Sequence, residues 1–165
     1  MKRISVVFII SLLVSLPVIA KDKAVFIRIV DGDTIVVNLD GKKEKIRLIG
    51  IDTPESKSNS KAFKDSQRSG DDIEVIVAHG KAASNFVKSL LKKGDILGLE
   101  YDAQRRDKYG RLLAYVYLPD GGMLNEKIIK SGYASQMTIP PNNKYQEKFS
   151  NAYNHARVNK LGLWE

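Results

Sequence analysis

The chain has 165 residues, with 27 basic against 19 acidic side chains, two histidines and no cysteine. Without cysteine, disulfides, thiolate nucleophiles, zinc–thiolate sites and lipoprotein attachment are excluded. The formal net charge of +8 favours polyanionic partners such as nucleic acid. An anionic membrane surface would suit the same charge, so charge indicates a class of partner but no reaction.

Residues 1–20 have the pattern of a secretory signal peptide. Lys2 and Arg3 form a positive region, an apolar run follows over residues 4–16, and residues 18–20 form a small-residue cleavage site. The run is short for a membrane span, and an uncleaved anchor is the alternative. Cleavage would leave one domain, residues 21–165, whose net charge of +6 reflects the loss of Lys2 and Arg3. We then expect a secreted or periplasmic monomer without stable membrane association.

The first part of this domain reads as a three-stranded meander. Segments rich in β-branched residues predict strands over 24–30, 34–39 and 45–49, with Asp40-Gly41 as the hairpin turn between the second and third. The polar stretch 56–70 that follows predicts a mobile loop with room for one short helix.

The rest of the chain predicts alternating helices and strands. Apolar residues over 71–93 recur on one helical face, and Asp71 with Glu74 resembles a capping box, although the start of this segment also reads as a strand. Strands over 95–101 and 112–118, a short helix over 123–131 and a final helix over 142–160 follow. No repeat or second core is evident. We therefore expect an α+β fold, a five-stranded OB-type Greek-key β-barrel with about three α-helices.

Three short motifs carry the chemistry: Asp31-Gly-Asp33-Thr34, Asp52-Thr53-Pro54-Glu55 and Asp107-Lys-Tyr109-Gly-Arg111, with Arg47 five residues before the second. They supply hard carboxylate oxygens for a divalent cation, a further carboxylate placed to act as a base, and two guanidinium groups suited to a phosphate. This set indicates a metal-dependent phosphodiesterase.

The carboxylates divide into ligands and a base. Asp33 and Asp52 fall at the edge of one sheet, where a backbone carbonyl, waters and a phosphate oxygen would complete an all-oxygen shell for calcium. Glu55 follows Pro54, whose fixed φ restricts the chain direction, and could orient or deprotonate the attacking water. Asp31 is interpreted as a turn residue or a support for the ligands.

The basic residues suit a phosphate. Arg47 and Arg111 present planar forks that pair bidentately with phosphate oxygens, and their attraction grows as charge accumulates in the transition state. Lys108 is a plausible nonspecific phosphate contact. Tyr109 either lies near the phosphate or packs against its own turn.

In their order and spacing these motifs, with a short helix beginning near Leu124-Asn125-Glu126 and a C-terminal Leu163-Trp164, resemble the thermonuclease, or staphylococcal nuclease, family over roughly residues 25–164. The resemblance implies an OB-type barrel with three helices and a calcium-dependent nuclease that acts on DNA and RNA. It implies cleavage on the 5′-oxygen side of the phosphodiester, leaving 3′-phosphates.

The same resemblance assigns roles to individual positions. Asp33 and Asp52 match the family's calcium ligands, and Thr53 matches the residue that supplies the carbonyl oxygen. Glu55 matches the glutamate that acts on the attacking water, and Tyr109 the tyrosine that hydrogen-bonds near the phosphate.

Two departures from the family pattern stand out. Met137 and Ile139 occupy positions where the staphylococcal enzyme has tyrosines that stack on a base, which removes roughly 1 to 3 kcal/mol of stacking per base. The region 56–80 is longer than in that enzyme and forms either a lid over the nucleic acid or an insertion.

Two other functions compete with a nuclease. An OB-fold module that binds nucleic acid without catalysis would have no need for Arg47, Glu55 and Arg111 together, yet all three are present. An exported protein that binds calcium for structural reasons explains the aspartates but leaves both arginines without a role.

Overall fold

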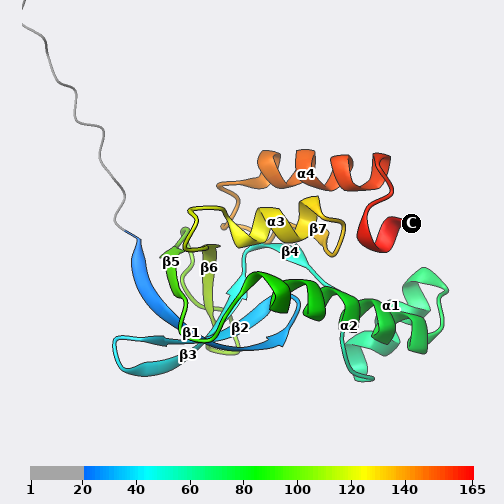
Figure 1. The fold of residues 1–165 in the computed structure, drawn as a ribbon. Coiled ribbons are helices and arrows are strands. Elements are labelled where there is room, and N and C mark those ends of the chain that lie inside the picture. The colour runs from blue at the N-terminus through cyan, green and yellow to red at the C-terminus, as the bar shows by residue number, and fades with distance from the viewer. Residues whose placement is uncertain (1–20) are drawn as a thin grey trace, which may run out of the picture.

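The computed structural model describes residues 21–165, in which five strands close into a barrel with helices packed around it (Figure 1). The predicted signal peptide, residues 1–20, lies outside the described residues. The strands of the barrel are β1 (Asp22–Asp31), β2 (Thr34–Leu39), β3 (Lys42–Leu48), β5 (Ile96–Glu100) and β6 (Leu112–Tyr117). They follow the order β1-β2-β3-β6-β5, with β3 and β6 parallel and the other pairs antiparallel. This arrangement confirms the predicted fold class.

Alternation along β3 decides which side chains enter the core. Ile46 and Leu48 are buried inside the barrel, so Arg47 between them points to the other face of the sheet. Arg47 pairs in register with Thr34 of β2 and Leu113 of β6. The period of two thus places a half-buried guanidinium on the outside of the barrel.

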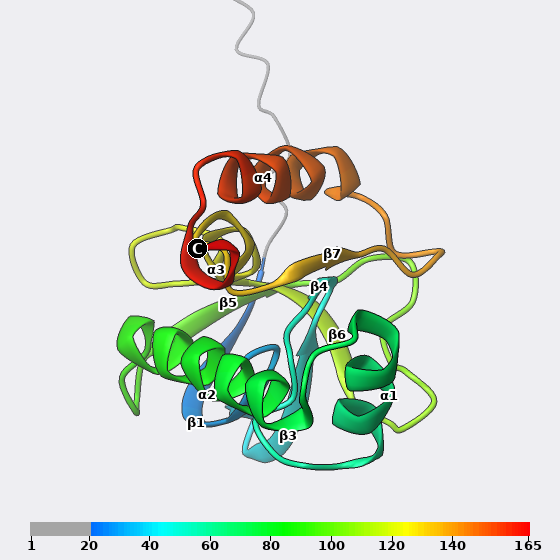
Figure 2. The ribbon, with the colours of Figure 1, turned by 90° about the vertical axis from the view of Figure 1, so that its right-hand side faces the viewer.

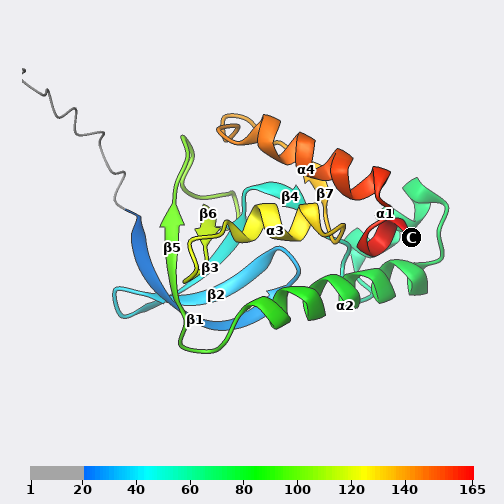
Figure 3. The ribbon, with the colours of Figure 1, turned by 45° about the horizontal axis from the view of Figure 1, so that its top comes forward.

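Four α-helices cover the barrel: α1 (Ser60–Ser69), α2 (Ile73–Leu90), α3 (Leu124–Lys130) and α4 (Gln146–Val158), followed by a 3-10 turn at Gly162–Trp164. Figures 2 and 3 show α3 lying between α4 and the barrel, while α2 runs along the other side with α1 beside it. Within residues 21–165, none of the helices combines the length and the apolar character needed to cross a membrane.

Helix α1 is the one beyond the three expected, and it occupies most of the segment predicted as a mobile loop. Asn59 caps it, because its Oδ1 accepts the backbone N–H groups of Lys61 and Ala62 at 3.0 and 2.9 Å. Ala62 is fully buried, and Gly70 ends the helix with a left-handed φ of 83°. The N-cap residue Asn59 and the C-cap residue Gly70 are both residue types that mark helix ends in a sequence.

Several predicted boundaries differ from the structure, among them those of two helices. Helix α2 begins after Asp72, whose side chain forms no cap hydrogen bond, so the predicted capping box at Asp71 is wrong. It ends at Leu90 rather than at residue 93. The final helix begins at Gln146 rather than at residue 142, because the Asn142 side chain instead pairs with the backbone N–H and C=O of Gln104, at 2.7 and 2.8 Å.

A second, two-stranded sheet was not predicted. It joins β4 (Gly50–Asp52) to β7 (Ser135–Met137). Gly50 turns the chain between β3 and β4 with a φ of +82°, and a Cβ there would lie 2.4 Å from the Phe149 ring. The buried Asn125 of α3 donates to the carbonyl of Ile49 at 2.9 Å. Both contacts fix the path of the chain into Asp52.

A buried carboxylate, Glu100, lies at the end of β5. Its oxygens accept hydrogen bonds from Tyr117, Tyr145 and the ammonium of Lys144. Burial raises the pKa of Glu100, but these donors outweigh burial and hold it below its ordinary value. The cluster ties β5 and β6 to the start of α4.

Candidate active site

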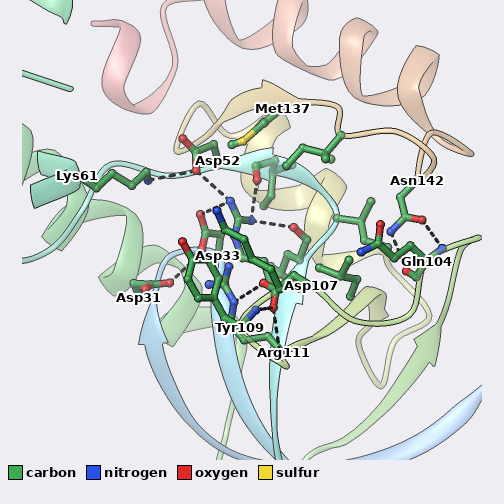
Figure 4. Close-up of a pocket in the computed structure, with 18 of the residues that line it drawn as sticks. Asp31, Asp33, Asp52, Lys61, Gln104, Asp107, Tyr109, Arg111, Met137 and Asn142 are labelled. Atoms are coloured by element: carbon green, nitrogen blue, oxygen red, sulfur yellow. Dashed lines mark hydrogen bonds and ion pairs between the residues drawn. The ribbon is translucent and has the colours of Figure 1, made fainter. Parts of the chain in front are cut away.

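The predicted site residues converge on one cavity of about 450 Å³ at the side of the barrel (Figure 4). Its walls come from the ends of β1, β3 and β4, the segment leading into α1, the turn 107–111 and the segment 137–142. The side chains that line this cavity include those of Asp31, Asp33, Arg47, Asp52, Glu55, Lys61, Asp107, Lys108, Tyr109, Arg111, Met137 and Ile139. Thr53 is the one predicted residue not among those lining the cavity.

Asp33 is held in place from three sides. One oxygen accepts from the hydroxyl of Thr34 at 3.0 Å, and the other accepts from the backbone N–H of Thr53 at 3.0 Å and pairs with Arg47 at 3.1 Å. Gly32 allows this approach, since a Cβ there would lie 2.8 Å from the Thr53 hydroxyl. Burial raises the pKa of Asp33, but Arg47 and the Thr53 N–H outweigh it and the pKa is lowered. Asp33 is therefore ionised beside Thr53.

Asp31 lies at the mouth of the same turn. Its Oδ1 accepts the backbone N–H of Asp33 at 3.3 Å, which confirms the predicted turn role. Burial and the adjacent charge of Asp33 raise the pKa of Asp31 to about 6. The pair thus holds a proton more tightly than two separate aspartates would.

Asp52 sits between two cations. Its Oδ1 is 2.9 Å from Arg47 Nη2 and 3.2 Å from Lys61 Nζ. Burial nevertheless raises the pKa of Asp52, and the nearby charge of Asp33 adds to the effect, while Lys61 and Arg47 oppose it. A further positive charge at this point would stabilise the ionised form.

Glu55 is fixed through both carboxylate oxygens. Oε2 accepts from the side-chain amide of Asn59 at 2.8 Å, and Oε1 pairs with Lys61 at 3.0 Å. Its backbone rests against Gly80 of α2, where a Cβ would lie 2.2 Å from the Glu55 carbonyl. The predicted base is therefore positioned by the cap of α1 and by a glycine of α2.

Arg47 is almost fully occupied by the protein itself. Nη1 donates to the carbonyls of Leu48 and Ile51, at 2.8 Å each, and Nη2 reaches both Asp33 and Asp52. This guanidinium joins β3 to β4 and holds the two carboxylates together. Both of its terminal nitrogens are therefore already used, by two carbonyls and two carboxylates.

Arg111 has a different environment. Its Nε donates to Asp107 Oδ2 at 2.7 Å, whereas its two terminal nitrogens have no hydrogen bond with any residue of the range 21–165 that the structure describes. Asp107 Oδ1 also accepts the backbone N–H groups of Tyr109 and Arg111, which closes the turn. Arg111 therefore presents a preformed fork to the cavity, the geometry that bidentate phosphate binding requires.

Tyr109 and Lys108 lie at the rim beside this fork. The Tyr109 ring is 73% exposed, and the cations of Lys108 and Arg111 lie 5.1 and 5.5 Å from its centroid. Packing against the turn does not bury the tyrosine. Its exposed face and its position favour contact with a bound substrate.

The oxygen donors fit a hard cation. Asp33, Asp52 and the Thr53 carbonyl provide only carboxylate and carbonyl oxygens, the ligands that calcium prefers. No three His, Cys, Asp or Glu side chains gather as a ligand set within residues 21–165. The protein would therefore supply two carboxylates and a carbonyl, and waters and substrate the rest of the shell. An ammonium already lies among these oxygens, which shows that they form a cation-attracting group.

The sequence interpretation missed four residues of this cavity and its support: Asn59, Lys61, Gly80 and Asp107. Asn59 had a recognisable signal, since asparagine is a favoured N-cap. Asp107 belongs to a motif that was noticed, but it was given no role. Lys61 and Gly80 had no local signal, because their importance arises from contacts with Glu55 on another segment.

An OB-type barrel whose side carries clustered carboxylates between two arginines defines the class of a phosphodiester hydrolase. Comparison with known proteins gives the family. Residues 45–165 match the family described as staphylococcal nuclease homologue. The chain belongs to this family, and its enzyme class is that of a nuclease.

Individual relatives agree with this assignment. The chain is 42% identical to the thermonucleases of Staphylococcus intermedius and Staphylococcus hyicus over 139 residues, which cover 84% of this chain and 73% of each of those proteins. It is 39% identical over 139 residues to endonuclease YncB of Bacillus subtilis, covering 83% of this chain and 59% of that protein. The substrate is accordingly nucleic acid.

Proposed function

We propose that this nuclease is a calcium-dependent endonuclease that hydrolyses DNA and RNA with little sequence selectivity and leaves 3′-phosphates. One observation supports the proposal above the others: Asp33, Asp52 and Glu55 share a single cavity with the fork of Arg111, whose terminal nitrogens have no hydrogen-bond partner within residues 21–165. A binding module would gain nothing from a carboxylate fixed at both oxygens beside a phosphate fork. A structural calcium site would not require the fork.

The mechanism follows from where each group lies. Asp33, Asp52 and the Thr53 carbonyl would hold calcium, which would supply positive charge to a phosphate oxygen when bound. Glu55, held by Asn59, orients or deprotonates a water for attack on phosphorus. The new P–O bond forms as the bond to the 5′-oxygen breaks. The attacking water gives up a proton to Glu55 or to solvent, the 5′-oxygen takes up a proton from solvent and leaves as a hydroxyl, and the phosphate stays on the 3′ side.

Arg111 stabilises the transition state in this scheme. Its terminal nitrogens pair with the equatorial phosphate oxygens, where negative charge accumulates during attack. Asp107 keeps the guanidinium plane in place through Nε, so no reorganisation is needed when the phosphate arrives. Lys108 at the rim adds general attraction for the backbone.

Low sequence selectivity is expected because these contacts address the phosphate. Met137 and Ile139 line the cavity where a base would lie, and Ile139 is 63% exposed. Neither side chain provides the aromatic stacking, worth roughly 1 to 3 kcal/mol per base, on which single-strand binding often relies. Tyr109 is the aromatic ring at the rim. Affinity should therefore depend strongly on phosphate contacts and on salt.

We also propose that the protein is exported and is a monomer. The pattern of residues 1–20 and the absence of cysteine support a secreted or periplasmic protein whose signal is removed after Ala20. N-terminal sequencing of the exported protein tests this part. Retention of Met1 would favour the anchored alternative.

The central test is a cleavage assay. Residues 21–165 are incubated with single-stranded DNA and with RNA, in calcium and in excess chelator, with E55Q as the matched control. Calcium-dependent fragments that carry 3′-phosphates, and are absent with E55Q, are expected. Binding without fragments would instead favour the catalytically inactive nucleic-acid module, and undiminished cleavage in chelator would exclude the metal.

A further inference from the structure

Lys61 lies where a bound cation would be attracted. Its ammonium is 3.2 Å from Asp52 Oδ1, 3.2 Å from the carbonyl oxygen of Thr53 and 3.0 Å from Glu55 Oε1. Two of these oxygens belong to the proposed calcium ligands and the third to the proposed base. Figure 4 shows the Lys61 side chain reaching toward Asp52.

We propose that Lys61 is an internal cation that competes with calcium for these oxygens and must leave them when calcium binds. The inference rests on the proposed calcium site. It assigns to α1, a helix not foreseen as part of the site, the role of setting how much calcium is needed to fill it.

Charge and distance make the two cations incompatible. Calcium binds oxygen at about 2.3 to 2.6 Å, so an ion sharing Asp52 Oδ1 with the ammonium at 3.2 Å would lie within about 6 Å of it. Like charges at that separation in a partly buried cavity repel strongly. The hydrogen bonds from Lys61 also use lone pairs of Asp52 Oδ1 and of the Thr53 carbonyl oxygen, which belong to the proposed calcium ligands.

The ammonium can leave without unfolding the helix. The backbone of Lys61 is fixed by the Asn59 cap and by the burial of Ala62, whereas its own side chain is 39% exposed. Rotation about the side-chain bonds is therefore enough to move the charge into solvent. The same cap positions Asn59 to donate to Glu55, so the proposed base keeps this hydrogen bond after Lys61 leaves.

Lys61 also explains how the carboxylates remain together before calcium binds. Asp33 and Asp52 repel each other, and the charges of Lys61 and Arg47 offset that repulsion. Removing the lysine charge should strengthen the attraction of this group for calcium.

The test compares calcium affinity by isothermal titration calorimetry in wild type, K61M, K64M and D52A, without nucleic acid. Lys64 is exposed on the same helix and is the matched control for loss of one positive charge. We expect K61M to bind calcium at least about tenfold more tightly and K64M to stay within about twofold of wild type. Equal effects of K61M and K64M, or unchanged or weaker binding by K61M, would overturn the inference.

The D52A variant separates this result from the proposed function. If wild type and D52A bind calcium alike, the metal site itself is wrong. If D52A loses binding while K61M resembles wild type, only the role of Lys61 fails.

A second measurement uses the unmodified protein and therefore does not depend on the folding of a variant. Amine acylation of Lys61 and Lys64 is followed by mass spectrometry with and without calcium. Calcium should raise the reactivity of Lys61 several-fold and leave that of Lys64 unchanged, because only Lys61 is released from its partners. Reactivity of Lys61 that calcium does not alter would contradict the displacement.

Discussion

Gly80 is a sensitive test of how the predicted base is positioned. The residue is buried in α2, and a Cβ there would lie 2.2 Å from the carbonyl carbon and oxygen of Glu55 and 2.5 Å from the N of Ser56. All of these are backbone atoms, so no side chain can rotate away. Space, rather than backbone conformation, requires glycine at this position.

The G80A variant should therefore move Glu55 away from α2. An ordinary contact between such atoms is about 3.5 Å or longer, so a methyl at 2.2 Å forces a relative shift of about 1 Å. A misplacement of 1 Å can cost about 10²-fold in rate. Alanine also gains about 1 kcal/mol of helix propensity, which offsets part of the strain. We expect turnover to fall about 100-fold in a protein that remains folded.

The assay is steady-state cleavage of single-stranded DNA, with urea unfolding in parallel. G98A is the matched control, because its added methyl would meet the flexible Lys21 side chain at 3.3 Å. If the loss acts through Glu55, G80A should have little further effect in an E55Q background. A folded G80A protein with turnover within a factor of three of wild type would refute the argument.

Three further predictions concern charges. D52A should abolish both calcium binding and turnover with little loss of stability, because Asp52 is half-buried. D33A should also lower the free energy of unfolding by about 1 to 3 kcal/mol, since it leaves buried hydrogen-bond donors without a partner. Calorimetry and urea unfolding check both, and full activity of either variant would contradict the prediction. R111K should lose orders of magnitude in kcat without loss of stability. R47K should lose both kcat and stability, since of the two arginines only Arg47 donates to two carbonyls. Equal stability of the two variants would contradict this. E100Q should cost about 2 kcal/mol at neutral pH. Because the pKa of Glu100 is lowered in the folded state, that stabilisation is present above the ordinary carboxyl pKa and is lost as the pH falls through the folded-state pKa. A stability difference between E100Q and wild type that does not shrink in acid would refute this prediction.

The features that the sequence predicted well are those with short-range causes. The Asp40-Gly41 pair made the predicted hairpin turn between β2 and β3, as turn chemistry requires, and the strand predicted over 34–39 has the bounds of β2. The fold class followed from the same pattern. Asp33 and Asp52 were expected at the edge of one sheet, but Asp33 follows β1 of the barrel whereas Asp52 ends β4 of the separate two-stranded sheet.

The features that it missed depend on contacts between distant segments. The sheet of β4 and β7 pairs residues more than 80 positions apart, and nothing local marks so short a strand. Asn142 would suit a helix start, yet its side chain satisfies the backbone of Gln104 instead. Lys61 looks like one polar residue of a polar stretch, and only the cap of α1 aims it at Asp52.

The two arginines, which the motifs treat as equivalent, differ in their contacts. Within residues 21–165 the terminal nitrogens of Arg111 have no hydrogen-bond partner and Asp107 orients its Nε, so in the proposed mechanism it would accept a phosphate without exchanging partners. Arg47 spends its terminal nitrogens on two carbonyls and on Asp33 and Asp52, the same carboxylates that the proposed calcium ion needs. In the proposed calcium complex these carboxylates would turn to the ion, and Arg47 Nη2 would lose partners at the cavity. A phosphate oxygen of the substrate would then satisfy its charge, so filling of the metal site would favour completion of the phosphate clamp.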